Sequence, residues 1–173
     1  MPPRFSVFIA TSLDGYIARA DGNIDWLSAV QTPGESYGYE SFFGSVDTLV
    51  IGRGTYDTVR GFPDWPYGGK RVVVLTGRPG ESLHGEVFFT GPVTDLAAHL
   101  DEASRVYVDG GNVIRQFLAA GLITDITLSI VPVVLGGGIR LFDGGEGEHR
   151  LELCGQHTWP SGLVQMEYRV VGA

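Results

Sequence analysis

The chain contains very little cysteine and lysine. Its 173 residues include one cysteine, Cys154, and one lysine, Lys70, and twelve basic residues face twenty acidic ones, for a formal net charge of −8. A lone cysteine excludes an internal disulfide and a cysteine-based zinc site, and the four histidines are not spaced as metal ligands, so no metal is expected. Nucleic-acid binding is not expected either, because it requires clustered basic residues.

Long apolar runs are also missing. No stretch approaches the roughly 18 to 20 apolar residues that a membrane helix needs, and residues 1–4 lack the apolar start of a secretory signal. We therefore expect a cytoplasmic protein without a membrane partner. A hydrophobic content of 43% is enough for one core and no linker divides the chain, so we expect a single domain over residues 1–173.

Three segments share a pattern of a polar residue, a short β-branched or aromatic run, and a glycine turn. They are "DTLVIGRGTYDTV" from Asp47, "KRVVVLTGRPG" from Lys70 and "SRVYVDGGNVIRQFLAAG" from Ser104. Runs that are apolar at consecutive positions are typical of parallel strands covered by helices on both faces. Further strands are expected near the start and from Ile123, and the tail should form a hairpin turning at residues 160–162. The sequence thus predicts an α/β fold with a mostly parallel central sheet, flanking helices and an antiparallel C-terminal hairpin.

The three glycine turns follow the predicted strands at their carboxyl ends. In an open α/β sheet these ends meet at one edge, where ligands bind. Each turn also offers groups that suit an anion. In chain order they are Arg53 and Thr55, then Thr76 and Arg78, then the amides of Gly110, Gly111 and Asn112. Neither G-x-x-x-x-G-K-[ST] nor G-x-G-x-x-G occurs, but the three turns together predict a nucleotide or dinucleotide ligand.

The order of these pieces resembles the dihydrofolate reductase fold over nearly the whole chain. The matching pieces are a first strand that ends in Ala10, a loop that leads to Trp26, then "VIGRGTY" and "VDGGNVIRQFL". The resemblance implies NADPH as the cofactor, with the first turn at the 2′-phosphate or pyrophosphate, the second at the adenosine and the third at the pyrophosphate. It also implies a cis peptide between Gly110 and Gly111. The implied cofactor-binding residues are Ala10, Ile17, Gly52, Arg53, Thr55, Thr76, Gly77, Arg78, Gly110, Gly111, Asn112 and Val113.

Two other stretches resemble a particular branch of this superfamily. "S-x-D-G-x-I-A", Ser12 to Ala18, and "P-x-x-L-G-G-G-x-x-L-F", Pro132 to Phe142, are similar to the reductase domain of the bifunctional riboflavin-biosynthesis deaminase-reductase. The deaminase half is absent, because no His-x-Glu with a Pro-Cys-x-x-Cys partner occurs. The resemblance therefore implies a free-standing reductase that acts on a small molecule.

Hydride transfer usually needs a proton donor beside the reduced atom. The folate enzymes carry a carboxylate on the first helix for this, and the matching region here contains Glu40 but no aspartate. We predict Asp14 and Glu40 as catalytic candidates, with Asp14 near the nicotinamide, although Glu40 could equally be a solvated helix residue. By the same match, Trp26 and Ser129 would contact the substrate.

The activity implied is an NADPH-dependent reduction of a pterin, a pyrimidine or a related flat heterocycle. Two alternatives remain open: a protein that binds NADP without turnover, and a true dihydrofolate reductase. Relatives with the Pro132 to Phe142 loop are commonly dimers, and the apolar run "LSIVPVVL" would expose a sheet edge unless a second chain or the tail covers it. We predict a homodimer.

Overall fold

The computed structural model describes residues 1–172. Within this part of the chain, no helix has both the length and the apolar character that crossing a membrane requires. The elements, in chain order, are β1 (Arg4–Ser12), β2 (Tyr16–Ala18), the 3-10 helix η1 (Asp25–Val30), α1 (Tyr39–Ser45), β3 (Thr48–Gly52), α2 (Arg53–Val59), β4 (Arg71–Leu75), β5 (Val87–Phe89), α3 (Val93–Ala98), β6 (Arg105–Asp109), α4 (Gly111–Ala119), β7 (Ile123–Val131), β8 (Ile139–Arg140), β9 (Leu151–Thr158) and β10 (Val164–Val170).

One eight-stranded sheet dominates the fold, in the order β5-β4-β3-β6-β1-β7-β10-β9. The six strands from β5 to β7 in this order run parallel, and β10 and β9 add to them antiparallel. The prediction of a mostly parallel sheet with an antiparallel C-terminal hairpin is confirmed.

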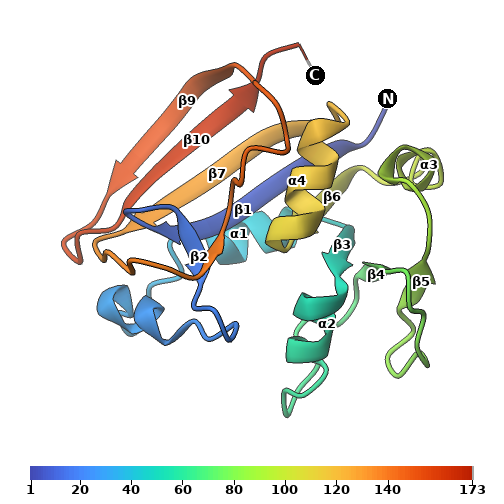
Figure 1. Cartoon of the computed structure of the whole chain (residues 1–173), viewed down its shortest axis with the longest axis horizontal. Coiled ribbons are helices and arrows are strands. Elements are labelled where there is room, and N and C mark those ends of the chain that lie inside the picture. Colours follow the sequence, from blue (N-terminus) through green and yellow to red (C-terminus); the bar gives the residue numbers. More distant parts are fainter. Residues whose placement is uncertain (173) are drawn as a thin grey trace.

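The sheet is covered on both faces, as its consecutive apolar residues predict. In β3 the neighbours Leu49, Val50 and Ile51 are all 0% exposed. Val50 packs in the core formed with α3 and α4, while Leu49 and Ile51 pack in a second core with Phe42 of α1. Successive strand residues point to opposite faces, so a central strand with two covered faces must be apolar throughout. Figure 1 shows α4 in front of the sheet and α1 behind it.

The C-terminal hairpin covers the edge of β7. Strand β10 pairs with β7 from Val164 opposite Ile130 to Arg169 opposite Asp125, and β9 is left at the outer edge. Of the two ways to cover the "LSIVPVVL" edge, the structure uses the tail. The edge of β7 therefore does not require a second chain.

A second, two-stranded sheet was not predicted from the sequence. It pairs β2 with β8 and so joins the segment after β1 to the segment after β7. The approach is close enough to require glycine: a Cβ on Gly138, at φ +134°, would lie 2.2 Å from the carbonyl oxygen of Ala18. The motif at residues 132–142 thus serves to bring β8 onto β2.

Candidate functional site

The three predicted glycine turns meet at one edge of the sheet. Strands β4, β3 and β6 are direct neighbours, and they run parallel, so their carboxyl ends lie side by side. Each of these ends leads into one of the turns. The prediction that segments distant in sequence gather here is confirmed by the strand order.

The first and third turns touch at Gly110. A Cβ built on Gly110 would lie 2.9 Å from the Thr55 hydroxyl oxygen and 3.7 Å from the backbone nitrogen of Gly52. Gly110 also has φ +96°, a conformation that favours glycine. The predicted cis peptide between Gly110 and Gly111 is wrong for this structure, since residues 1–172 contain no cis bond. The positive φ of Gly110 makes the sharp turn instead.

The first and second turns are joined by Arg53. Its Nη1 donates to the carbonyl oxygen of Arg78 at 2.5 Å, and its Nε lies 3.0 Å from Asp57 Oδ1. In the second turn, the Arg78 N–H donates to the Thr76 hydroxyl at 3.1 Å, while Gly77 has open space around its Cα. The guanidinium is therefore held at this edge of the sheet, between two turns, rather than extended into solvent.

A buried carboxylate, which we did not predict, supports the loop after the second turn. Glu86 is 3% exposed and accepts hydrogen bonds from the Tyr56 hydroxyl at 2.5 Å and from the N–H groups of Leu83 and His84 at 2.9 and 2.7 Å. Burial acts to raise the pKa of Glu86, but these donors outweigh it and lower the pKa to about 2. The ionised Glu86 thus fixes residues 83–86 beside α2.

Helix α4 begins at the third turn with free backbone donors. Its N-terminus has no side-chain cap, and the first N–H bonded back within the turn is that of Ile114, which donates to the Gly110 oxygen at 2.9 Å. The N–H groups of Gly111, Asn112 and Val113 are thus left over at the helix start, where the helix dipole favours an anion. The side chain of Asn112 is exposed, whereas Val113 is buried and packs beneath Gly52.

Ile17, one of the predicted cofactor-binding residues, lies next to this helix start. A Cβ on Gly111 would come within 2.8 Å of Ile17 Cδ1, so Ile17 rests directly on the first turn of α4. Ala10 pairs with Ser129 in the sheet and packs against the cluster that contains Trp26. Ile17 therefore contacts the third glycine turn, and Ala10 contacts the cluster that contains the predicted substrate residue Trp26.

The substrate candidates form a polar group within an otherwise apolar cluster. Ser129 is 4% exposed, and its hydroxyl accepts a hydrogen bond at 3.0 Å from Gln165, whose Nε2 also donates to the Tyr37 carbonyl at 2.9 Å. Trp26 is 4% exposed, and its Nε1–H has no hydrogen-bond partner among the described residues. A buried donor without a partner is costly, so Trp26 needs an explanation beyond core packing. Gln165 was missed because a glutamine in a hairpin strand carries no sequence signal.

Asp14, predicted near the nicotinamide, has its carboxylate bound to the end of β1 and to the segment that follows β7. Its carboxylate accepts hydrogen bonds from the Ser12 hydroxyl at 2.6 Å and from the N–H groups of Leu135 and Gly136 at 3.1 and 2.7 Å. The Ser12 hydrogen bond, with help from these two amides, lowers the pKa of Asp14 to about 2. An aspartate that is ionised throughout the neutral range cannot donate a proton, so these contacts favour a structural role for Asp14.

Two further carboxylates bear on the question of the proton donor, the predicted Glu40 and Asp109. Glu40 lies exposed on α1. Asp109, which we did not select from the sequence, ends β6 directly before Gly110, and burial raises its pKa to about 6 despite a hydrogen bond from the Gly110 N–H. The sequence did contain a signal for Asp109, because an acidic residue stands there between a predicted buried strand and a pair of glycines. The raised pKa makes Asp109 a further candidate proton donor.

Asp109 shares a face of the sheet with the substrate candidates. In β6 it alternates with Tyr107, whose ring packs against Phe42 of α1 at 5.0 Å. In β1, Phe8 alternates with Ala10 and its ring also packs against Phe42, at 4.9 Å. Because side chains alternate along strands, Asp109 and Ala10 both point to the α1 face.

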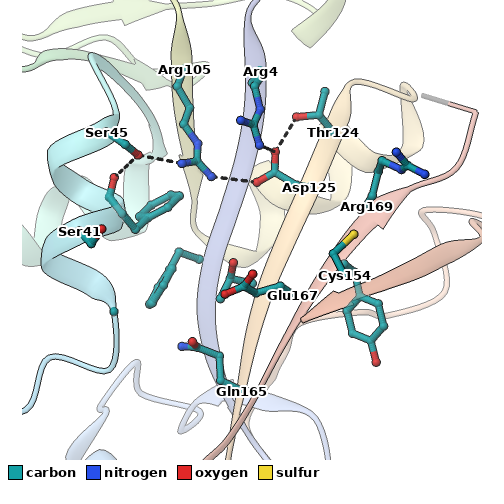
Figure 2. A pocket seen from close by; sticks show the side chains of 15 residues that line it. Arg4, Ser41, Ser45, Arg105, Thr124, Asp125, Cys154, Gln165, Glu167 and Arg169 are labelled. Atoms are coloured by element: carbon teal, nitrogen blue, oxygen red, sulfur yellow. Dashed lines mark hydrogen bonds and ion pairs between the residues drawn. The ribbon is translucent and has the colours of Figure 1, made fainter. Parts of the chain in front are cut away.

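A separate cleft of about 690 Å³ lies between α1 and the hairpin on the same face. Figure 2 shows that its upper part is closed by an ion-pair network, in which Arg105 contacts both Ser45 and Asp125, and Arg4 also binds Asp125. None of the predicted site residues lines it. The cleft meets the substrate candidates only at Gln165, so the network mainly ties α1 to the sheet.

Together, the strand order and the flanking helices define a dihydrofolate reductase-like α/β protein with three glycine turns at one edge of its sheet. The chain belongs to the RibD C-terminal domain family, which matches residues 3–164. It is 36% identical over 168 residues to the uncharacterized protein YwjB of Bacillus subtilis (strain 168), covering 94% of this chain and 95% of YwjB.

Solved structures agree with this assignment. A Shewanella sp. PV-4 protein provisionally assigned to riboflavin biosynthesis is 36% identical, with a TM-score of 0.89 over 96% of this chain and 98% of that one. Dihydrofolate reductase from Enterococcus faecalis, complexed with NADP(H), has a TM-score of 0.67 at 16% identity, covering 99% and 98%. The second likeness shows the fold alone. The predicted family and fold are confirmed, and the chain has the fold of a reductase family.

Proposed function

We propose that the protein is an NADPH-dependent reductase that transfers a hydride to a flat heterocycle of the pterin or pyrimidine type. The observation that carries the proposal is the contact at Gly110, where the first and third turns approach so closely that no side chain fits between them. This contact gathers one arginine, one hydroxyl and the free amides of α4 within a single edge of the sheet. Fold likeness alone would not fix a reaction.

The residues present fit a phosphorylated dinucleotide. The amides at the start of α4 and the Thr55 hydroxyl would hold the pyrophosphate, Arg53 would hold the 2′-phosphate, and residues 76–78 would flank the adenosine. Ile17 would then lie against the nicotinamide. A reduced nicotinamide supplies a hydride when bound; the E. faecalis dihydrofolate reductase, which shares the fold, is complexed with NADP(H).

The substrate side fits a flat ring with a lactam edge. Trp26 offers an N–H donor that lacks a partner, and Ser129 offers a hydroxyl. Gln165 offers its carboxamide oxygen, because its Nε2 already donates to Tyr37 and Ser129. Such a set of donors and one acceptor matches a ring that presents carbonyl oxygens beside an N–H. Asp109, protonated below about pH 6, would deliver the proton that accompanies the hydride.

Arg53 provides the experiment that tests the cofactor assignment. We expect the wild type to bind NADPH more tightly than NADH, and Arg53→Ala to lose roughly 10- to 100-fold in NADPH affinity with little change for NADH, because a charge-assisted contact to phosphate is lost. Fluorescence titration of both cofactors measures this.

Arg60→Ala is the matched control. Arg60 also approaches Asp57, at 3.7 Å, and lies over the Tyr56 ring, but no hydrogen bond to the second turn is present. No preference for NADPH in the wild type, or a preference that survives Arg53→Ala, would overturn the assignment. NADPH affinity without turnover of any pterin or pyrimidine would favour the alternative of a binding protein.

We further propose that the protein is a cytoplasmic homodimer that associates through one face of the C-terminal hairpin. The hairpin is amphipathic: the α1 face carries Gln165, Glu167 and Arg169, whereas the opposite face is uncharged. The apolar part of that face is the end that holds Leu151 and Leu153, which are 42% and 52% exposed, while Gln156 and Thr158 are polar residues at its other end. A chain with net charge −8 repels its copy, so an uncharged apolar face is the surface best suited to self-association.

Sedimentation tests the dimer directly. We expect the wild type at micromolar concentration to sediment with twice the 18.6 kDa chain mass, and Leu153→Glu to sediment with the mass of one chain. Leu83→Glu is the control, since Leu83 is equally exposed, at 56%, but lies far along the chain from the hairpin. A wild type that sediments as one chain would refute the dimer, and a dimer that survives Leu153→Glu would refute this face.

A further inference from the structure

The β2–β8 sheet covers the start of α4. A Cβ on Gly111 would lie 2.8 Å from Ile17 Cδ1 of β2 and 3.4 Å from the carbonyl oxygen of Arg140 in β8. Both strands therefore rest on the first turn of the helix, where the proposed pyrophosphate site lies. In Figure 1 the segment that follows β8 runs beside α4, in front of the main sheet.

One side chain of α4 holds this segment. Arg115 Nη1 donates to the carbonyl oxygens of Arg140 at 2.7 Å and Leu141 at 3.2 Å, and its Nε lies 3.2 Å from Asp143 Oδ2. The Arg115 side chain is only 18% exposed. Its Nη1 and Nε are thus committed to three contacts within residues 140–143.

Backbone hydrogen bonds link the segment that Arg115 holds to strand β2, which contains Ile17. The Leu141 N–H donates to the Gly15 oxygen at 3.1 Å, and Tyr16 pairs with Arg140. Leu141 itself is 1% exposed in the main core. Residues 140–143 are therefore fixed to α4 on one side and to β2 on the other, so a shift of this segment would also move β2.

We propose that Arg115 is a positioning residue, which clamps the β2–β8 sheet over the first turn of α4 and so holds Ile17 against the bound dinucleotide. The proposal rests on the proposed function, because it requires a dinucleotide at Gly110 and Gly111. Arginine suits this task because its donors lie on separate nitrogens of a rigid planar fork, so Nη1 reaches two carbonyls while Nε reaches the carboxylate; lysine has its three donors on a single nitrogen. Asp143 fixes the orientation of the fork.

Three variants and one control test the clamp: Arg115→Ala, Arg115→Lys, Asp143→Asn, and Gln116→Ala on the exposed side of the same helix. The first readout is hydrogen exchange at the Leu141 amide, which reports whether β8 stays paired. We expect Arg115→Ala to speed this exchange roughly tenfold and to weaken NADPH binding by a similar factor, with Arg115→Lys only partly restoring both. Asp143→Asn should have a smaller effect, and Gln116→Ala none.

Two results would overturn the clamp. One is an unchanged Leu141 exchange rate in Arg115→Ala; the other is faster exchange with unchanged NADPH affinity, which would leave Arg115 a purely structural residue. If Arg115→Ala fails to fold, Arg115→Lys and Asp143→Asn give the same comparison. Failure of the wild type to bind NADPH would refute the proposed function instead, while the exchange measurement would still decide whether Arg115 holds the sheet.

Discussion

Replacing Asp109 with asparagine is expected to lower turnover by roughly 100-fold or more and, at the same time, to stabilise the folded protein at neutral pH. The loss of activity follows from the loss of the proposed proton donor. In the wild type, kcat/KM should fall about tenfold per pH unit above about pH 6, because the protonated form of Asp109 is the active one. In Asp109→Asn this dependence should disappear.

The gain in stability follows from the pKa shift of the same group. Burial raises the pKa of folded Asp109 to about 6, against 3.8 for an ordinary aspartate. Between these values the unfolded chain releases its proton while the folded chain keeps it, so stability falls as the pH rises. The loss reaches about 3 kcal/mol by pH 7. Asparagine does not titrate, and its side-chain oxygen can still accept the Gly110 N–H bond, so the variant avoids this loss.

Denaturant unfolding at pH 4 and pH 7, with kinetics over the same range, measures both effects. Asp14→Asn is the informative comparison. Because the pKa of Asp14 is lowered to about 2, its ionised form stabilises the folded state above the ordinary pKa, and the substitution should destabilise the protein at neutral pH. If Asp109→Asn kept the pH dependence of the wild type, a group other than Asp109 would be the proton donor.

The second large effect is expected for Gly110→Ala. An alanine here must adopt φ +96° and place its Cβ 2.9 Å from the Thr55 hydroxyl oxygen, so the first and third turns are forced apart. We expect a loss of about 1–3 kcal/mol in unfolding free energy. NADPH affinity should fall roughly 10- to 100-fold, because the Thr55 hydroxyl and the amides of α4 could no longer donate to the cofactor phosphates together.

Gly121→Ala separates backbone strain from crowding. Gly121 has φ +69°, so alanine is strained there too, but nothing lies within 4 Å of the added Cβ. Calorimetry combined with NADPH titration should show destabilisation in both variants and loss of affinity only in Gly110→Ala. Near-normal NADPH affinity in Gly110→Ala would contradict the proposed cradle.

The sequence was informative wherever local chemistry decides the structure. Consecutive apolar residues such as Leu49 to Ile51 identify a strand covered on both faces, and a glycine after such a strand identifies a turn. Because parallel strands share one edge, the gathering of the three turns also followed. These features depend on periods of two residues and on single-residue turn preferences, both of which are visible without a fold.

Features decided by tertiary contacts could not be obtained in this way. Strand β8 is two residues long and exists because Gly138 permits contact with Ala18. The roles of Asp14 and Asp109 depend on whether amides or buried surroundings meet the carboxylate. An Asp-Gly pair occurs at both positions, so the sequence alone could not distinguish the ionised loop anchor from the candidate acid.

The strand order has a consequence for how the chain folds. Strand β1 lies in the middle of the sheet, between β6 and β7, although it is the first strand to be synthesised. It pairs with residues 105–107 on one side and residues 123–131 on the other, so its two neighbours are both distant in sequence. Closing such long loops costs entropy before any pairing repays it, which slows folding. On the ribosome, the apolar β1 therefore has no partner in its own sheet until most of the chain has emerged.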